Sequence, residues 1–380
     1  MNKLFIIGNG FDLAHGLKTS YKDFLLWYVK KCVDTLWDKP DYQDEMIRIK
    51  RRDGYQYSIP GQSIDADAFD SVIEIFSYLD GNDSYWDYDI PSPFFEVILK
   101  SEKADWVNIE NIYYQFLSGL IKEKQSQKSK EAILILNSNM DFIRDKLIEY
   151  LKENCCEFQF NLAHNKYQKI LGKVDSYDEN TNDGGKEAIK TGLKESNSLF
   201  VNFNYTPLVE KYFNSLDKQG SPFELIQIHG SIEKPNSIVF GFGDELDDVY
   251  LEMERQNNND YFKHIKSFKY FQDENYQNLM SFVEAEPFEV IVLGHSLGLS
   301  DRTMLSQIFE HKNLEKVQLY YYDNNEGNND FTEKTQEISR HFSDKGRMRL
   351  KVVPFTRSRP MPQLNITNNI HKKSNYLKNQ

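Results

Sequence analysis

Short apolar runs and longer amphipathic stretches alternate along this chain, and the pattern predicts an α/β protein. The first run, Leu4 to Ile7, is continuously apolar, as is typical of a strand buried on both faces of a parallel sheet. Comparable runs return only in the second half, at 199–204, 224–230, 237–243, 289–294, 316–323 and 349–355. Helical stretches separate several of them, which predicts a Rossmann-like parallel sheet flanked by helices.

The segment between these strand-like regions has a different pattern. Apolar and aromatic residues keep helical spacing from Tyr21 to about Lys39, and a loop-rich, acidic stretch follows. Amphipathic helices are predicted at 106–120 and 131–152, before a polar, glycine-containing linker at 175–185. We therefore predict a discontinuous nucleotide-binding domain made of 1–35 and 191–360. A mostly helical insertion is predicted at 36–190 and a polar tail at 361–380.

Composition and charge narrow the class of protein. With 380 residues and 39% hydrophobic content, the chain can bury a full core. A net charge of -12 disfavours a dedicated nucleic-acid surface, since phosphate contacts need concentrated lysine and arginine. No apolar run could span a bilayer, and no signal-peptide pattern follows the break at Gly8, so we expect a soluble, cytoplasmic protein without a membrane partner. The three cysteines form neither a disulfide framework nor a C-x-x-C motif.

A glycine-rich turn, GNGFDLAHG, follows the first strand. Gly8 and Gly10 let the backbone turn sharply and approach a ligand, and the next helix would direct its N–H groups and positive dipole end at an anion. A phosphate-bearing ligand is the expected occupant. The third glycine is Gly16, and Leu13 occupies the position where the dinucleotide fingerprint needs a glycine. An ordinary strand-to-helix turn is the alternative interpretation.

Polar residues end two later strands, at the edge where open α/β sheets bind ligands. Asn204 can orient a water or a ribose hydroxyl because its amide both donates and accepts, although a helix-capping role is the alternative. His229 is followed by a glycine that leaves room for a ligand. Histidine takes a proton near neutral pH, which makes His229 a candidate general base, whereas a lone histidine is more often structural.

The segment from Gly294 to Gly298 also matches the nucleophile elbow G-x-S-x-G of serine hydrolases. Ser296 would be the nucleophile, with Asp323 and His341 following in the expected order. An elbow needs the helix to begin at the serine, whereas Ser300-Asp301 is predicted to cap the next helix. A serine hydrolase is the third hypothesis for this chain.

Five motifs together resemble one known family. GNGFDLAHGLKTSYKDF, FNYT, IHGS, VFGFGDE and GHSLGLSD, with Trp106 and Glu110 in WVNIE between them, look like the AbiH family of bacteriophage abortive-infection proteins. The resemblance covers nearly the whole chain. AbiH proteins are similar in turn to the sirtuin-like NAD-binding fold: the glycine turn resembles its phosphate loop, FNYT the N-Y-D strand end of NAD hydrolases, and IHG their catalytic His-Gly.

This resemblance implies catalytic roles for Asn204 and His229 in opening the C1'-nicotinamide bond of NAD or a related nucleotide. It implies a ligand site lined by Gly8, Asn9, Gly10, Phe11, Asp12, Gly16, Thr206, Gly243, Gly294, His295, Ser296 and Asp301. Thr206 replaces an acidic residue of the NAD hydrolases, which alters recognition of a nicotinamide amide. The nine residues between Gly230 and Phe240 lack the cysteines of sirtuin deacylases, so we expect neither deacylation nor a metal.

These observations suggest two classes of function. In the first, the protein is an anti-phage NAD glycohydrolase that depletes the cofactor when a phage-derived trigger activates it. In the second, the cleft only senses a nucleotide or a phage component, and the insertion signals to a partner. Both classes are compatible with a homo-oligomer. Glu110 shares a helix face with Trp106 and is interpreted as part of a solvated ion pair, with a position that reaches back to the cleft as the alternative.

Overall fold

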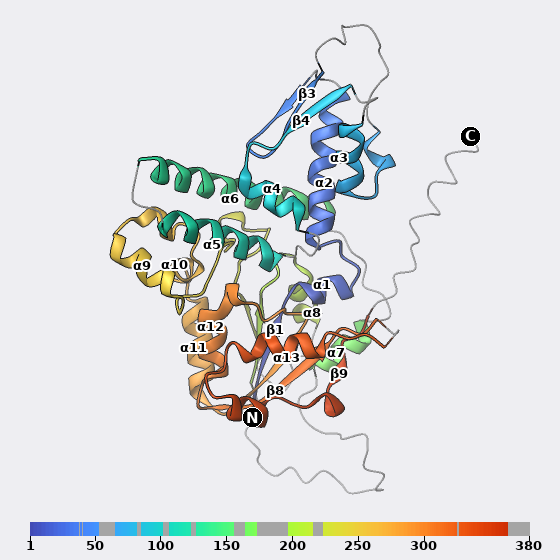
Figure 1. Cartoon of the computed structure of the whole chain (residues 1–380). Coiled ribbons are helices and arrows are strands. Elements are labelled where there is room, and N and C mark those ends of the chain that lie inside the picture. Colours follow the sequence, from blue (N-terminus) through green and yellow to red (C-terminus); the bar gives the residue numbers. More distant parts are fainter. Residues whose placement is uncertain are drawn as a thin grey trace, which may run out of the picture.

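The computed structural model describes residues 1–37, 39, 41–52, 65–81, 85–101, 106–122, 127–155, 164–172, 197–215, 223–324 and 327–363. The predicted linker at 175–185 and the tail beyond residue 363 lie outside the described residues, as does the side chain of Trp106. Figure 1 shows a sheet with flanking helices at the bottom of the view and a mostly helical part above it.

A six-stranded, all-parallel sheet forms the lower part and confirms the predicted α/β class. Its order is β6-β5-β1-β7-β8-β9. The strands are β1 (Asn2–Ile7), β5 (Ser198–Asn202), β6 (Phe223–Gln227), β7 (Phe288–Leu293), β8 (Leu314–Tyr321) and β9 (Arg359–Pro360). The chain passes from β1 to β5 and β6, then returns to place β7 on the other side of β1, so the order of the strands reverses at β1.

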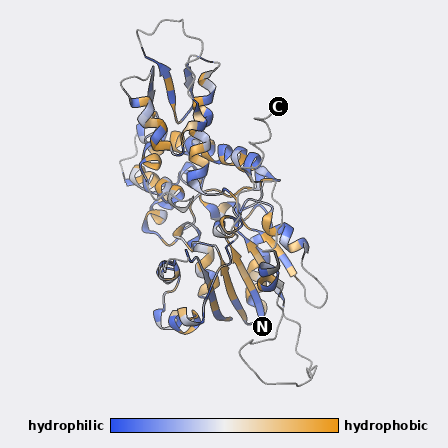
Figure 2. Ribbon diagram, turned by 90° about the vertical axis from the view of Figure 1, so that its right-hand side faces the viewer, coloured by the Kyte–Doolittle hydropathy of each residue, from blue (hydrophilic) through white to orange (hydrophobic). Residues whose placement is uncertain are grey.

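Helices cover both faces of this sheet because alternate side chains of its strands point to opposite sides. In β1, Leu4 and Ile6 belong to one apolar cluster, and Phe5 and Ile7 belong to another. The first cluster includes residues of α11 (Asn275–Ala285), α12 (Arg302–Phe309) and α13 (Phe331–Ser339). The second includes residues of α1 (Asn9–Ala14), α7 (His164–Gly172) and α8 (Leu208–Ser215). Figure 2 shows the strands between these helices as mainly hydrophobic.

The upper part contains the helices predicted from Tyr21 and at 106–120 and 131–152, which are α2 (Tyr21–Asp34), α5 (Trp106–Lys122) and α6 (Gln127–Asn154). Two shorter helices, α3 (Val72–Asp80) and α4 (Pro93–Lys100), were not predicted individually, and α3 lies in the stretch that was expected to be rich in loops. A three-stranded antiparallel sheet also occurs here, formed by β2 (Asp41–Gln43), β3 (Arg48–Arg51) and β4 (Trp86–Asp89). Its strands are so short that they leave no clear period in the sequence.

Two of the predicted strands are wrong. Residues 237–243 form no strand: Phe242 makes only an isolated bridge with Ile265, and its N–H donates to the carbonyl of His264. Of 349–355, residues 349–351 end α14 (Lys345–Lys351), Val352 makes only an isolated bridge with Val317 of β8, and Phe355 begins a 3-10 turn. The Asp344 carboxylate accepts from the backbone N–H groups of Gly346 and Arg347, which starts this helix. Short apolar runs do not distinguish strands from other buried segments.

The remaining helical elements connect these parts. They are α9 (Asp248–Gln256) and α10 (Lys266–Lys269), with 3-10 turns η1 (Thr35–Trp37), η2 (Ala66–Ala68), η3 (Pro235–Ser237), η4 (Asn259–Phe262), η5 (Leu299–Asp301) and η6 (Phe355–Arg357). In Figure 1, α9 and α10 lie beside α5, at the junction of the two parts. Helix α10 therefore lies where residues from both parts meet.

Gly119 offers a test of the α5 assignment. It lies in the helix interior, it is exposed, and a Cβ added there would meet nothing within 4 Å. Alanine loses less backbone entropy on folding than glycine does, so Gly119→Ala is expected to raise the free energy of unfolding by about 0.5–1 kcal/mol. Urea denaturation measures this change. A destabilised Gly119→Ala protein would contradict the helical placement of this residue.

Candidate functional site

A cavity of about 1020 Å³ opens at the carboxyl ends of the central strands. The turns after β1, β5 and β7 line one side of it, and Glu110 of α5 with Leu147 of α6 contributes to the other. Open α/β sheets bind ligands at the point where the strand order reverses, which is where this cavity lies. Its volume is at the upper end of the range typical of small-molecule sites.

The structure brings most of the predicted site residues to this cavity. It is lined by Gly8, Asn9, Gly10, Asp12, Asn204, Thr206, His229, Gly294, His295, Ser296 and Asp301. Phe11, Gly16 and Gly243 do not line it. Phe11 is fully buried against the ring of Tyr167, Gly16 adopts a left-handed conformation (φ 74°) after α1, and Gly243 packs its backbone against Ser300.

The two glycine turns pack backbone against backbone. A Cβ on Gly8 would lie 2.6 Å from the Cα of His295, and a Cβ on Gly10 would lie 2.8 Å from the Cα of Gly294. Gly294 itself has a φ of 69°, and a Cβ there would lie 2.1 Å from the backbone nitrogen of Phe11. Contact between the turns therefore requires these glycines, whether or not a ligand approaches them.

This contact also uses backbone amides that were expected to face an anion. The N–H of Gly8 donates to Leu293, that of Gly10 to Gly294, and that of Phe11 back to Gly8. Helix α1 has only six residues, so its dipole end is a weak anion site. Among the described hydrogen bonds, none uses the backbone N–H of Asn9 or Ser296. Both residues line the cavity.

A buried carboxylate connects the first turn to the end of β5. Asn204 Nδ2 donates to Asp12 Oδ1 at 2.9 Å and to the carbonyl of Gly8 at 3.1 Å. The hydroxyl of Thr206 donates to Asp12 Oδ2 at 2.7 Å. Because both amide hydrogens of Asn204 are engaged, only its Oδ1 can contact a ligand in the cavity. The hydroxyl hydrogen of Thr206 is likewise engaged, because it is donated to Asp12.

Burial raises the pKa of Asp12 to about 7, against the opposing hydrogen bonds from Thr206 and Asn204. In the unfolded chain the carboxyl has its ordinary pKa of 3.8, so the folded protein binds this proton more tightly. Its contribution to stability is therefore present below about pH 4 and is lost as the pH rises through about 7.

Asp12→Asn is consequently expected to flatten the fall in unfolding free energy between about pH 4 and pH 7, by an amount on the order of 4 kcal/mol at most. Urea denaturation across this pH range measures the slope. Asp67→Asn, which changes a side chain that is 99% exposed, should leave the slope as it is in the wild type. An unchanged slope in Asp12→Asn would show that Asp12 is ionised in the folded protein throughout this range.

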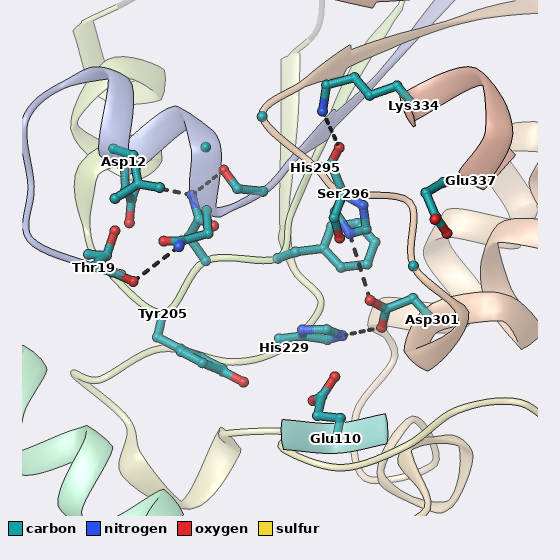
Figure 3. A pocket seen from close by; sticks show the side chains of 18 of the residues that line it. Asp12, Thr19, Glu110, Tyr205, His229, His295, Ser296, Asp301, Lys334 and Glu337 are labelled. Atoms are coloured by element: carbon teal, nitrogen blue, oxygen red, sulfur yellow. Dashed lines mark hydrogen bonds and ion pairs between the residues drawn. The ribbon is translucent and has the colours of Figure 1, made fainter. Parts of the chain in front are cut away.

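A cluster of buried charges surrounds Asp301 on the other side of the cavity (Figure 3). His229 Nε2 lies 3.1 Å from Asp301 Oδ1, and Lys266 Nζ lies 2.9 Å from the same oxygen. His295 Nε2 lies 3.8 Å from Asp301 Oδ2. Lys266 Nζ also donates to Glu110 Oε2 at 2.9 Å, so four segments of the chain meet at these charges.

The protonation states in the cluster follow from burial and from Lys266. Burial lowers the pKa of His229, and the charge of Lys266 acts in the same direction while Asp301 opposes both. Burial also lowers the pKa of His295, to about 3. Burial alone would raise the pKa of Asp301, but Lys266 and the histidines hold it well below its usual range. Both histidines are therefore neutral at physiological pH, beside an ionised carboxylate.

Several members of this cluster were not predicted from the sequence, or were predicted only as an alternative. The solvated ion pair preferred for Glu110 is wrong, and the alternative position at the cleft is the one found: Glu110 is 5% exposed, it accepts from the backbone N–H of Gly241, and burial raises its pKa to about 7. Lys266 has no motif around it that distinguishes it from surface lysines. Phe203 packs the edge of its ring against both histidines, with centroids 4.9 Å from His229 and 4.2 Å from His295. Its position in FNYT, beside Asn204, was the available signal.

The serine hydrolase hypothesis finds no support in this geometry. Helix α12 begins at Arg302, six positions after Ser296 rather than at it. His341 donates from Nε2 to the carbonyl of Leu297 at 2.7 Å, and neither His341 nor Asp323 lines the cavity. Asp301 does occupy the N-cap position of α12, but its side chain makes no capping bond and joins the charge cluster instead.

Comparison with known proteins adds one match to this geometry. The family described as "Bacteriophage abortive infection AbiH" matches residues 4–323 of the chain. The matched segment contains both glycine turns and all of the cavity residues that end β5, β6 and β7. No curated protein matches the chain. Within the described residues, no helix combines the length and the apolar character needed to cross a bilayer.

Proposed function

Since this chain belongs to the AbiH family of bacteriophage abortive-infection proteins, we propose that it acts in that defence as a glycohydrolase of NAD or a closely related nucleotide. The observation that carries the proposal is the convergence of Asn204, His229 and the two glycine turns on one cavity at the strand-order reversal. A sirtuin-like NAD-binding core, suggested by the order of the motifs, belongs to the same proposal.

His229 would act as the base in this reaction. Its neutral imidazole takes a proton from the attacking water or from a ribose hydroxyl, and the carboxylate of Asp301 lies 3.1 Å from its Nε2. Water adds to C1' of the ribose as the bond to nicotinamide breaks, through an oxocarbenium-like state. The products are nicotinamide and the hydroxylated nucleotide. Asn204 accepts a hydrogen bond at Oδ1 and so positions the hydroxyl or the water.

The rest of the cavity offers groups for the remainder of a nucleotide. The backbone amides of Asn9 and Ser296, which have no described acceptor, are suited to a phosphate oxygen. Tyr320 and Tyr322 also line the cavity, and their rings provide a surface on which a base could stack. The nucleotide is the expected ligand, and a phage-derived component is the expected trigger.

Two assays test the proposal. Purified protein is incubated with NAD and with related nucleotides, and release of nicotinamide is followed by chromatography. In parallel, NAD is measured in cells that carry the wild-type protein or Asn204→Ala, before and after phage infection. Cleavage in vitro or depletion on infection, lost in the variant, supports the proposal. Saturable nucleotide binding without cleavage in either assay would instead favour the sensing module, in which loss of Gly10 would matter more than loss of His229.

A further inference from the structure

Lys266 is a deeply buried charged residue of the cavity wall. Its side chain is 1% exposed, and those of its partners Glu110 and Asp301 are 7% and 6% exposed. It lies on α10, between the sheet and the helical part, and its ammonium group donates to one oxygen of each carboxylate at 2.9 Å. Neither a capping role nor the glycohydrolase mechanism accounts for a lysine at this position.

One oxygen atom of Asp301 is shared between this lysine and His229. Oδ1 lies 2.9 Å from Lys266 Nζ and 3.1 Å from His229 Nε2. Among the described residues, His229 Nε2 is buried and makes no hydrogen bond, so its contact with Asp301 Oδ1 is not a hydrogen bond. Lys266, in contrast, donates a hydrogen bond to this oxygen.

We propose that Lys266 is a positioning residue, which occupies Asp301 Oδ1 and thereby keeps His229 in the neutral form that can accept a proton. This inference rests on the proposed function in that His229 is taken as the base. Glu110 is the second support, since it anchors the other side of the ammonium from α5.

The physical argument concerns what Asp301 would do alone. An ionised carboxylate beside a buried imidazole favours the imidazolium, which has no lone pair to accept a proton. A fixed ammonium on the same oxygen cancels most of the electrostatic effect of the Asp301 carboxylate on His229. This effect is strong because charges in a buried site of low dielectric are poorly screened. Besides Asp301 and Lys266, the titratable groups that face His229 are His295 after β7, Tyr205 after β5 and Glu110 on α5. Lys266 is the only cation that contacts Asp301 Oδ1 among the described residues.

Histidine NMR tests this inference without any assay of turnover. Full-length protein with labelled histidine is titrated, and the His229 signal is assigned by its absence from His229→Gln. In Lys266→Met, the titration midpoint of His229 is expected to move to higher pH. In Glu110→Gln it should stay or move to lower pH, because Lys266 then pairs with Asp301 alone. Lys263→Met removes a half-exposed lysine paired with Asp141, and should leave the midpoint unchanged.

The outcomes separate this inference from the proposed function. A Lys266→Met midpoint at or below that of the wild type would overturn the role of Lys266, even if the protein cleaves NAD. A raised midpoint in a protein that never releases nicotinamide would support the role of Lys266 and reject the glycohydrolase. Where cleavage occurs, the acid limb of its pH-rate profile should move with the midpoint. If Lys266→Met does not fold, the double variant Lys266→Met/Glu110→Gln removes the lysine together with one of the two opposite charges beside it. The titration midpoint of His229 is then measured in this variant and is again expected at higher pH than in the wild type.

Discussion

Replacing His229 with alanine is expected to lower the rate of nicotinamide release about 10²- to 10⁴-fold, the contribution typical of a well-placed acid-base group. The imidazole is the neutral base of the cavity, and the described contacts place Asp301, Lys266 and Glu110 as its supports rather than as substitutes for it. Neutral His295 does not compensate, because its Nδ1 accepts from the backbone N–H of Leu297. The measurement is turnover of NAD by purified wild-type and variant protein at matched concentration.

A matched control separates catalysis from folding. His311→Ala removes an imidazole that does not line the cavity, so the turnover number should remain within about twofold of the wild-type value. Thermal unfolding of both variants shows whether each is folded at the assay temperature. Near-normal turnover in a folded His229→Ala protein would exclude His229 as the base, and would leave Asp12 as the next titratable group of the cavity to test.

Gly294→Ala is expected to cost about 4 kcal/mol or more of unfolding free energy, which is enough to prevent folding of a marginally stable protein. Two effects add. The left-handed φ of 69° costs an alanine about 1–2 kcal/mol, and its Cβ would lie 2.1 Å from the backbone nitrogen of Phe11 and 2.5 Å from the carbonyl carbon of Gly10. Both neighbours are backbone atoms, so α1 itself would have to move.

Gly327 isolates the first of these effects. Its φ is 90°, and a Cβ added there would meet nothing within 4 Å. Gly327→Ala should therefore show only the conformational cost, about 1–2 kcal/mol, in the same urea denaturation experiment. If Gly294→Ala and Gly327→Ala destabilise the protein equally, the turns do not interlock as the structure shows. In that case the glycines of the first turn would have to be explained by a ligand.

Much of the sheet could be predicted because its strands are nearly continuous apolar runs. Leu4 to Ile7 and Glu289 to Leu293 become β1 and β7, buried on both faces as such runs indicate. The run at 237–243 has a similar composition but packs as an irregular segment against His264 and Ile265. The local spacing of apolar residues does not show which distant segment a stretch of chain will pack against. The strand prediction for 237–243 was wrong for this reason.

The candidate site was predicted only where residues stand at strand ends. Asn204 and His229 follow strands directly, so parallel packing brings them to one edge. Lys266 and Glu110 lie on helices far from any strand, and their burial depends on a contact between α5 and α10 that leaves no trace in either segment alone. The glycines of the first turn were predicted to let a ligand approach closely. Another turn of the same chain is what approaches Gly8 and Gly10 in the structure, and the approach of a ligand stays a prediction.

The central position of β1 has a consequence for synthesis of this protein on the ribosome. β1 emerges first, yet both of its partners come late: β5 begins at Ser198 and β7 at Phe288. The large apolar cluster of the helical part draws mainly on residues 21–155, so it can condense while β1 is still unpaired. The nascent chain would thus carry an unpaired apolar strand until β5 and β7 have been synthesised, and we expect chaperones that bind such segments to influence its yield.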